Sequence, residues 1–194
     1  LKRAVDIPSE SILFNIDQKA DVISKDELDA LIAVFVKVFD EHCGYYGKQP
    51  YVAQFERELD ENGLLDAFKR EFAAIVGGGK DWEWGRKKSK IKAAEIDQAY
   101  TAVTGVGVKD ILDKYRADYR LSIEDFAEQV KAYIDSKGPD FRLNFFVDEV
   151  GQYVAGNVKL MTNLQTVAES LATKCSGRSW VVVTAQEDMS AVLG

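Results

Sequence analysis

The last part of the chain alternates between short apolar runs and one amphipathic segment. Residues 141–147 and 179–185 are apolar and rich in aromatic or β-branched side chains, which is typical of buried strands. Between them, residues 158–174 repeat apolar side chains at helical spacing. A strand, a helix and a strand of these lengths form a βαβ unit, in which the two strands are parallel. This part of the chain therefore predicts a parallel sheet.

A further strand is predicted near the amino terminus, where residues 11–17 form an apolar run that ends in an acidic side chain. Most of the sequence between this strand and the next has helical periodicity. We therefore predict an α/β fold with about three parallel strands in one layered core. Residues 1–23 and 137–194 form this core, and residues 24–136 form a helical insertion between the first and second strands.

The insertion carries clear helix boundaries. Ser24 with Glu27, and Ser122 with Asp125, have the spacing of capping boxes at the start of helices. An Asn-Gly pair divides the helical stretch 50–76 into two helices. The first helix of the insertion is expected between the Ser24 cap and Gly44, and further helices are expected at residues 91–103, 108–119 and 122–136.

Residues 77–92 (GGGKDWEWGRKKSKIK) combine three consecutive glycines with a run of basic side chains, and they are predicted to form a loop. The basic side chains could contact phosphates while the tryptophans stack on bases, so a DNA contact remains open. The pattern favours a solvated linker that is anchored by Trp82 and Trp84.

Composition limits the classes of function. The net charge of -7 argues against a surface that is a nucleic-acid footprint throughout. No apolar run approaches the roughly 20 residues of a membrane helix, and the first residues lack a signal-peptide pattern, so a soluble, cytoplasmic protein is expected. Cys43, Cys175 and His42 lack partners at metal-ligand or catalytic spacing, and structural roles are expected for them.

Two adjacent carboxylates end the predicted strand LNFFVDE, at Asp148 and Glu149. In an open parallel sheet, ligands bind beyond the carboxyl ends of the strands. This spacing resembles the Walker B motif of P-loop ATPases with a catalytic glutamate. In that motif the aspartate helps to hold Mg²⁺ through its water shell, and the next residue polarises the attacking water. The alternative is a strand that simply ends at polar residues.

The next predicted strand also ends in polar side chains. Thr184, or in second place Gln186, resembles the sensor 1 position of AAA+-like ATPases. A neutral polar side chain at that position hydrogen-bonds the γ-phosphate or the attacking water. The alternative is an ordinary threonine at a strand end. In such ATPases the second, third and fourth strands of the core lie side by side, and the three predicted strands would take those places.

The chain has no phosphate-binding loop. The stretch 77–80 (GGGK) is excluded, because the motif G-x-x-x-x-G-K-[ST] needs Gly at Ala74 and Ser or Thr at Asp81. The lysine and the backbone N–H groups of that loop supply much of the affinity for nucleotide phosphates. This chain by itself is therefore expected to bind ATP weakly or not at all.

Longer stretches carry a more specific resemblance. They are VDIPSESILFNID, DKYRADYRLSIEDFAEQVKAYI and FFVDEVGQYVAGNVKLMTNLQTVAESLATKCSGRSWVVVTAQEDM. They resemble the large P-loop ATPase of bacterial BREX phage-defence systems. The resemblance implies a larger protein with its phosphate loop before Leu1, with ATP and Mg²⁺ as cofactors and with other BREX components as partners in blocking phage DNA replication.

The resemblance also implies roles for particular residues. Asp148 is expected to bind the metal and the cofactor, Glu149 and Thr184 to be catalytic, and Gln186 to contact the cofactor. An arginine finger and sensor 2 would lie after Gly194.

Two classes of function remain open. The first is an internal segment of a BREX-type ATPase that is inactive by itself. The second is a non-enzymatic interaction module that uses the helical insertion. The apolar strand 179–185 also has an edge that a second copy could cover, so a homo-oligomer is possible.

Overall fold

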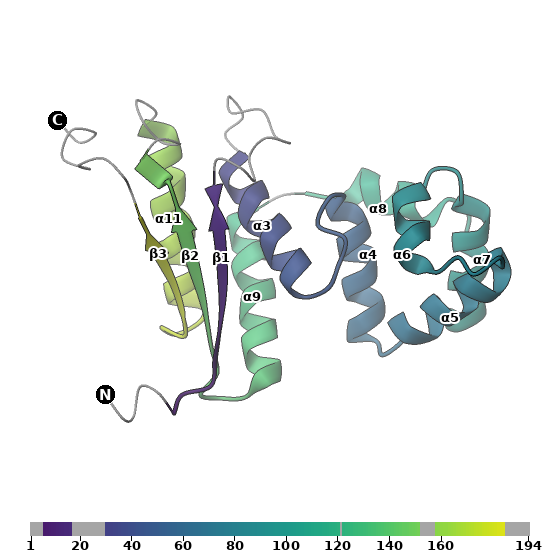
Figure 1. Ribbon diagram of the computed structural model, residues 1–194, viewed down its shortest axis with the longest axis horizontal. Helices are drawn as coiled ribbons and strands as arrows, with labels where there is room; N and C mark the ends of the chain where they lie inside the picture. Colours follow the sequence, from purple (N-terminus) through teal and green to yellow (C-terminus); the bar gives the residue numbers. More distant parts are fainter. Residues whose placement is uncertain (1–5, 17–29, 121, 152–157, 185–194) are drawn as a thin grey trace. The chain divides into compact units, whose positions relative to one another are not determined.

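The computed structural model describes residues 6–16, 30–120, 122–151 and 158–184. Its sheet has three strands, β1 (Ser9–Asn15), β2 (Arg142–Asp148) and β3 (Ser179–Val183), which are all parallel and lie in the order β1-β2-β3 (Figure 1). This confirms the predicted α/β fold, with three parallel strands side by side.

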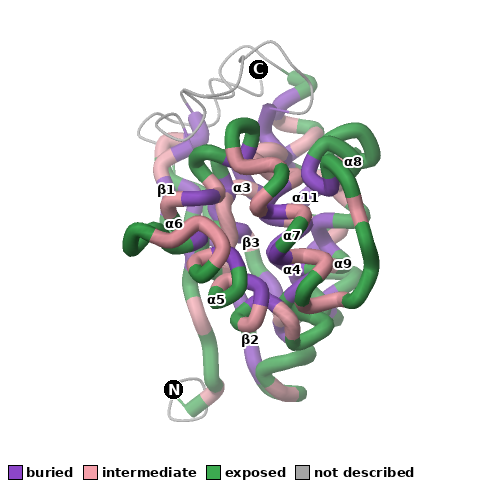
Figure 2. Tube along the Cα trace, turned by 90° about the vertical axis from the view of Figure 1, so that its right-hand side faces the viewer, coloured by how far each residue is buried: buried purple, intermediate pink, exposed green. Residues whose placement is uncertain are grey.

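One face of the sheet is buried under helices. Along β2, buried and more exposed residues alternate, as expected for a strand with one covered face. Figure 2 marks the buried residues of the chain in purple. The ring of Phe145 on β2 lies 5.6 Å from that of Phe35 and 5.9 Å from that of Phe126, between ring centroids. These contacts come from helices α3 (Ala30–His42) and α9 (Ile123–Lys137), while α11 (Val158–Lys174) packs against α9 and β3.

The chain divides into two compact units, one of Leu1–Phe39 with Leu121–Gly194 and one of Asp40–Arg120. The second unit is shorter than the insertion predicted at residues 24–136. The difference arises because most of α3 and all of α9 belong to the unit that contains the sheet. Large aromatic side chains of both helices are buried against the sheet. Their helical periodicity alone could not show which layer they cover.

The unit Asp40–Arg120 is helical. It contains α4 (Pro50–Glu61), α5 (Leu65–Val76), α6 (Trp82–Gly85), the 3₁₀ helix η1 (Arg86–Lys88), α7 (Ala93–Thr104) and α8 (Ile111–Asp118). The predicted break at Asn62-Gly63 is confirmed between α4 and α5. The unit has a core of its own, formed by Val52, Phe55, Leu59, Leu65, Phe68, Phe72, Trp82, Ile96, Ala99, Ile111 and Leu112.

The predicted helix cap before α9 is confirmed, since the Ser122 side chain accepts a hydrogen bond of 2.9 Å from the backbone N–H of Asp125. The capping box of Ser24 and Glu27 lies outside the described residues. His42 lies in the last turn of α3, and both cysteines are free thiols. Within the described ranges, no helix combines the length and the apolar character needed to cross a membrane.

The prediction of a loop at residues 77–92 is wrong in its central part, where α6 and η1 form. Tertiary contacts account for the difference. Trp82 is 1% exposed, and its ring lies 4.9 Å from that of Phe68 and 5.2 Å from that of Phe72, between centroids. Its indole N–H donates a hydrogen bond of 2.6 Å to Glu56. A one-turn helix has little stability in isolation, and here the buried indole stabilises it.

Asp40 gives the helical unit a pH dependence. Burial raises the pKa of Asp40 from 3.8 to about 6, although Arg57 forms an ion pair with it. The folded state therefore binds more protons than the unfolded chain between these pH values, and stability is lost as the pH rises through this window. We expect the free energy of unfolding to fall by about 2 kcal/mol between pH 4 and pH 6 from this group.

The measurement is urea unfolding followed by circular dichroism across that pH range, for the wild type and for Asp40→Asn. The variant should show a flatter dependence of the unfolding free energy on pH. Parallel profiles for the two proteins would assign the pH dependence to other groups.

Candidate functional site

Polar side chains gather at the carboxyl edge of the sheet, where all three parallel strands end. Asn15 is the last residue of β1 and lies opposite Asp148, the last residue of β2. Val147 lies opposite Val183, so Thr184 follows β3 at the same level. The register of parallel strands therefore brings Asn15, Asp148, Glu149 and Thr184 to one edge. The arrowheads in Figure 1 mark the carboxyl ends of the three strands.

Asp148 is held by its neighbours on two elements. Its Oδ1 accepts a hydrogen bond from the hydroxyl of Thr184 and another, of 3.0 Å, from the backbone N–H of Glu149. The backbone fixes Thr184 as well, because its N–H donates to the carbonyl of Val147 at 3.0 Å and its carbonyl accepts from Val150 at 3.1 Å. Two of the predicted site residues, Asp148 and Thr184, are therefore in direct contact.

Glu149 has a left-handed backbone, with φ of 61°. This conformation is uncommon for residues other than glycine, and it recurs at functional sites where the surroundings enforce it. The Asn15 side-chain amide donates a hydrogen bond to Glu149 Oε2. The turn therefore directs the Glu149 carboxylate toward β1, while Asp148 faces Thr184 on the β3 side.

Asn15 was missed by the sequence analysis. The predicted first strand ran to residue 17, which made Asn15 an interior strand position. In the structure, β1 ends at Asn15. The sequence did hold a signal for Asn15, because its amide side chain stands among apolar residues near the end of a predicted strand. Its pairing with Asp148 depends on the register of the two strands.

The edge is accessible to solvent. Asp148 and Thr184 are exposed and Glu149 is half-buried. In the part of the chain that the structure describes, Asp148 Oδ2 has no hydrogen-bonding partner, since both bonds of this carboxylate involve Oδ1. Carboxylate and hydroxyl oxygens are the kind of donor that Mg²⁺ accepts, directly or through water. The donor chemistry of Asp148 thus suits a magnesium ion. Gln186 lies outside the described residues.

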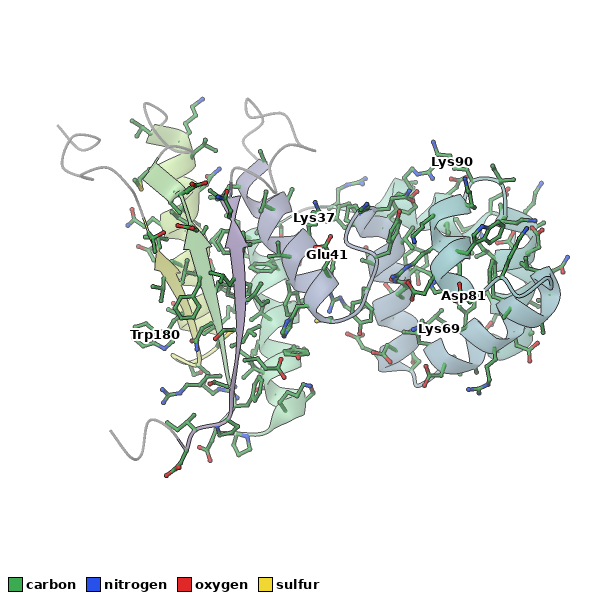
Figure 3. The ribbon with its side chains drawn as sticks, in the orientation of Figure 1. Lys37, Glu41, Lys69, Asp81, Lys90 and Trp180 are labelled. Carbon is green, nitrogen blue, oxygen red and sulfur yellow. The ribbon has the colours of Figure 1, made fainter. Side chains whose placement is uncertain are left out.

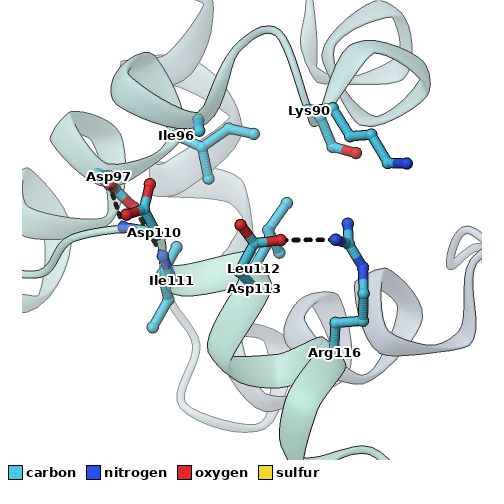
Figure 4. Close-up of a pocket in the computed structure, with 10 residues that line it drawn as sticks. Lys90, Ile96, Asp97, Asp110, Ile111, Leu112, Asp113 and Arg116 are labelled. Atoms are coloured by element: carbon cyan, nitrogen blue, oxygen red, sulfur yellow. Dashed lines mark hydrogen bonds and ion pairs between the residues drawn. The ribbon is translucent and has the colours of Figure 1, made fainter.

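A cavity of about 290 Å³ lies in the helical unit, between the turn before α7 and the start of α8 (Figure 4). Asp97 uses its carboxylate to cap α8, accepting from the backbone N–H groups of Asp110 at 2.7 Å and Ile111 at 3.0 Å. Asp113 forms an ion pair of 2.7 Å with Arg116. These acidic side chains already have partners, so the cavity has mainly a structural character.

No family model matches the chain, and no solved structure matches it. The fold and the site thus define an α/β protein with a three-stranded parallel sheet and a polar cluster at the carboxyl edge of that sheet.

Proposed function

We propose that this chain supplies the Walker B and sensor 1 elements of a P-loop ATPase core, and that the phosphate-binding loop comes from residues outside the chain. The observation that carries the proposal is the cluster of Asn15, Asp148, Glu149 and Thr184 at one carboxyl edge, linked by two side-chain hydrogen bonds. The resemblance to the BREX ATPase family suggests that this activity serves phage defence, together with other BREX components.

In this proposal each side chain has one task. Asp148 would hold the water shell of a Mg²⁺ ion through its Oδ2 atom, and the metal would supply charge neutralisation for the phosphates. Glu149 orients and polarises the attacking water. Thr184 donates its hydroxyl proton to Asp148 in the structure, and it would turn that donor toward the γ-phosphate oxygen or the water when a nucleotide is bound. Asn15 holds the Glu149 carboxylate through its amide and is a positioning residue.

The order of the strands supports the proposal. Neighbouring strands of the sheet are all parallel, and they lie in the order β1-β2-β3 that is expected for the second, third and fourth strands of such a core. A further parallel strand that carries the phosphate loop at its carboxyl end could pair with the outer edge of β3, which would bring that loop beside Thr184 and one strand away from Asp148. ATP binding then needs both parts, so the chain alone should bind Mg·ATP weakly or not at all.

The test is ATP hydrolysis by a longer protein that includes the sequence before Leu1. We expect that sequence to contain G-x-x-x-x-G-K-[ST], and we expect turnover to depend on Glu149. The absence of such a motif, together with unchanged turnover in Glu149→Gln, would overturn the proposal.

Thr184 offers a graded test of the same site. In the longer protein, Thr184→Val should lower the turnover number by about 100-fold, because it removes one donor from the developing charge. Thr184→Ser keeps the hydroxyl and should retain most of the activity. The measurement is steady-state hydrolysis at saturating Mg·ATP, with binding of a fluorescent nucleotide as the second readout. Equal turnover in the valine and serine variants would remove Thr184 from the site.

A second candidate function is a non-enzymatic interaction module. The observation that favours it is the separate hydrophobic core of the unit Asp40–Arg120, which gives the helical unit a structure that does not depend on the sheet. The two functions are compatible within one protein.

A further inference from the structure

The segment from Lys80 to Lys92 is held firmly against the core of the helical unit. Trp82 is buried among phenylalanine rings, and Asp81 caps the turn by accepting a hydrogen bond of 2.9 Å from the backbone N–H of Trp84. At Gly85, an added Cβ atom would lie 2.3 Å from the ring of Phe72. Only glycine fits there, so the backbone of this segment packs directly on the core.

The following turn is fixed in the same way. Arg86 forms ion pairs with the buried Glu56 at 3.2 Å and with Glu83. Ser89 is 5% exposed, and the N–H of Ile91 donates to the carbonyl of Lys88 at 2.9 Å. The lysines of this turn therefore project from a rigid backbone, and ordering them on a ligand costs only side-chain entropy.

The acidic side chains within the segment are already engaged. Asp81 serves the backbone of Trp84, and Glu83 serves Arg86. Lys92 has its own partner, Glu95, at 2.5 Å. The remaining cations of the segment form no ion pair within the described residues. They are Lys80, Lys87, Lys88 and Lys90.

The neighbouring cavity is lined by only one of these four cations, Lys90. Lys90 and Arg116 lie on the same side of it, and Asp113 is paired with Arg116 (Figure 4). Several carboxylates line the cavity and would repel an anion, so an anion should bind to the exposed lysines outside the cavity and not within it. In Figure 3, Asp81 and Lys90 can be found in the helical unit.

We propose that Lys80, Lys87, Lys88 and Lys90 form a nucleic-acid-binding surface, here called the lysine surface, which contacts the phosphate backbone. Four cations concentrate on one short segment of a chain whose net charge is -7. Lys80 is held in place by Trp84, with its ammonium group 4.5 Å from the centroid of the indole. The cations of the lysine surface therefore extend from a backbone that the core of the helical unit holds in place.

The chemistry favours a phosphate backbone over other anionic partners. Lysines act as point charges toward phosphates, whereas arginine suits carboxylates through two parallel hydrogen bonds, and Arg86 is already engaged with Glu56 and Glu83. Firm binding to a membrane surface is favoured by an apolar face beside the lysines, and Ile91 is the exposed large apolar side chain that this segment offers. The contact would be independent of base sequence.

The test is fluorescence anisotropy of a labelled mixed-sequence DNA duplex, titrated with the whole chain at several salt concentrations in the absence of ATP. The wild type should bind at low salt, and the logarithm of its affinity should fall with the logarithm of salt concentration at a slope of about -3 to -4 for four phosphate contacts. In the triple variant Lys87→Gln, Lys88→Gln and Lys90→Gln, the magnitude of this slope should be smaller by about 3. Its affinity at low salt should fall by at least about tenfold.

Two matched variants separate the lysine surface from net charge and from folding. Lys69→Gln, Arg70→Gln and Lys109→Gln remove the same charge from other parts of the helical unit, and they should leave the slope near that of the wild type. Replacing Lys87, Lys88 and Lys90 by arginine keeps the charge and should retain binding. Circular dichroism checks that each variant is folded.

The proposal is overturned if the wild type does not bind the duplex at low salt, or if both glutamine variants lose the same slope. Binding to vesicles that contain phosphatidylserine, without binding to the duplex, would also overturn it. Since ATP is absent from these titrations, the result is independent of the proposed ATPase site.

Discussion

Replacing Glu149 by glutamine should lower ATP turnover of the longer protein by about 100-fold to 10,000-fold, the range expected when a general base is removed. The substitution keeps the size of the side chain and an oxygen that can accept the hydrogen bond from Asn15. It removes the negative charge that polarises the attacking water. The measurement is steady-state hydrolysis with saturating Mg·ATP, and a nucleotide-binding titration should give an affinity close to that of the wild type.

The matched control for this experiment is Glu169→Gln. Glu169 is an exposed carboxylate on α11, where it accepts a hydrogen bond of 2.8 Å from Gln165, and it is not among the residues of the candidate site. Its replacement makes the same chemical change and should leave turnover unaltered. A Glu149→Gln protein that hydrolyses ATP at the rate of the control would remove the catalytic role from Glu149, while a role for Asp148 in holding the metal could still stand.

Replacing Trp82 by alanine should destabilise the helical unit by about 3–5 kcal/mol, the usual cost of truncating a buried large aromatic side chain. The ring fills a space among Phe55, Phe68 and Phe72, and its loss leaves a cavity. Glu56 also loses the indole N–H as a hydrogen-bond donor, and burial already raises the pKa of Glu56. The measurement is urea unfolding followed by circular dichroism.

Two variants complete this experiment. Trp82→Phe keeps an aromatic ring and removes the N–H, so its cost should be smaller, about 1–3 kcal/mol. Trp180→Ala is the control, because Trp180 on β3 is 59% exposed and makes one hydrogen bond of 3.0 Å, from its indole N–H to the carbonyl of Gly177, so its loss should cost about 1 kcal/mol or less. If Trp82→Ala were no more destabilising than Trp180→Ala, the anchoring of the segment that carries the lysine surface would be refuted.

The two sets of experiments address different parts of the chain. Glu149 lies in the unit that contains the sheet, and Trp82 lies in the helical unit. A loss of turnover in Glu149→Gln with unchanged unfolding would therefore identify chemistry, whereas a loss of stability in Trp82→Ala would identify packing.

Local sequence determined the elements whose signals are local. The apolar runs of β1, β2 and β3, the Asn-Gly break between α4 and α5, and the Ser122 cap of α9 were all predictable, because propensity, turn chemistry and capping act within a few residues. The length of the βαβ unit also made the parallel pairing of β2 and β3 predictable. The two adjacent carboxylates were visible for the same reason, since they directly follow an apolar run.

Tertiary structure decided what depends on contacts between distant residues. The partnership of Asn15 with Glu149 depends on the register of two strands that are far apart in sequence, and the helix at Trp82 depends on a cage of phenylalanine rings from α4 and α5. Likewise, the assignment of α3 and α9 to the sheet depends on the face that their aromatic residues bury. Periodicity shows that one face of a helix is apolar. Which helix or strand packs against that face depends on the fold of the whole chain.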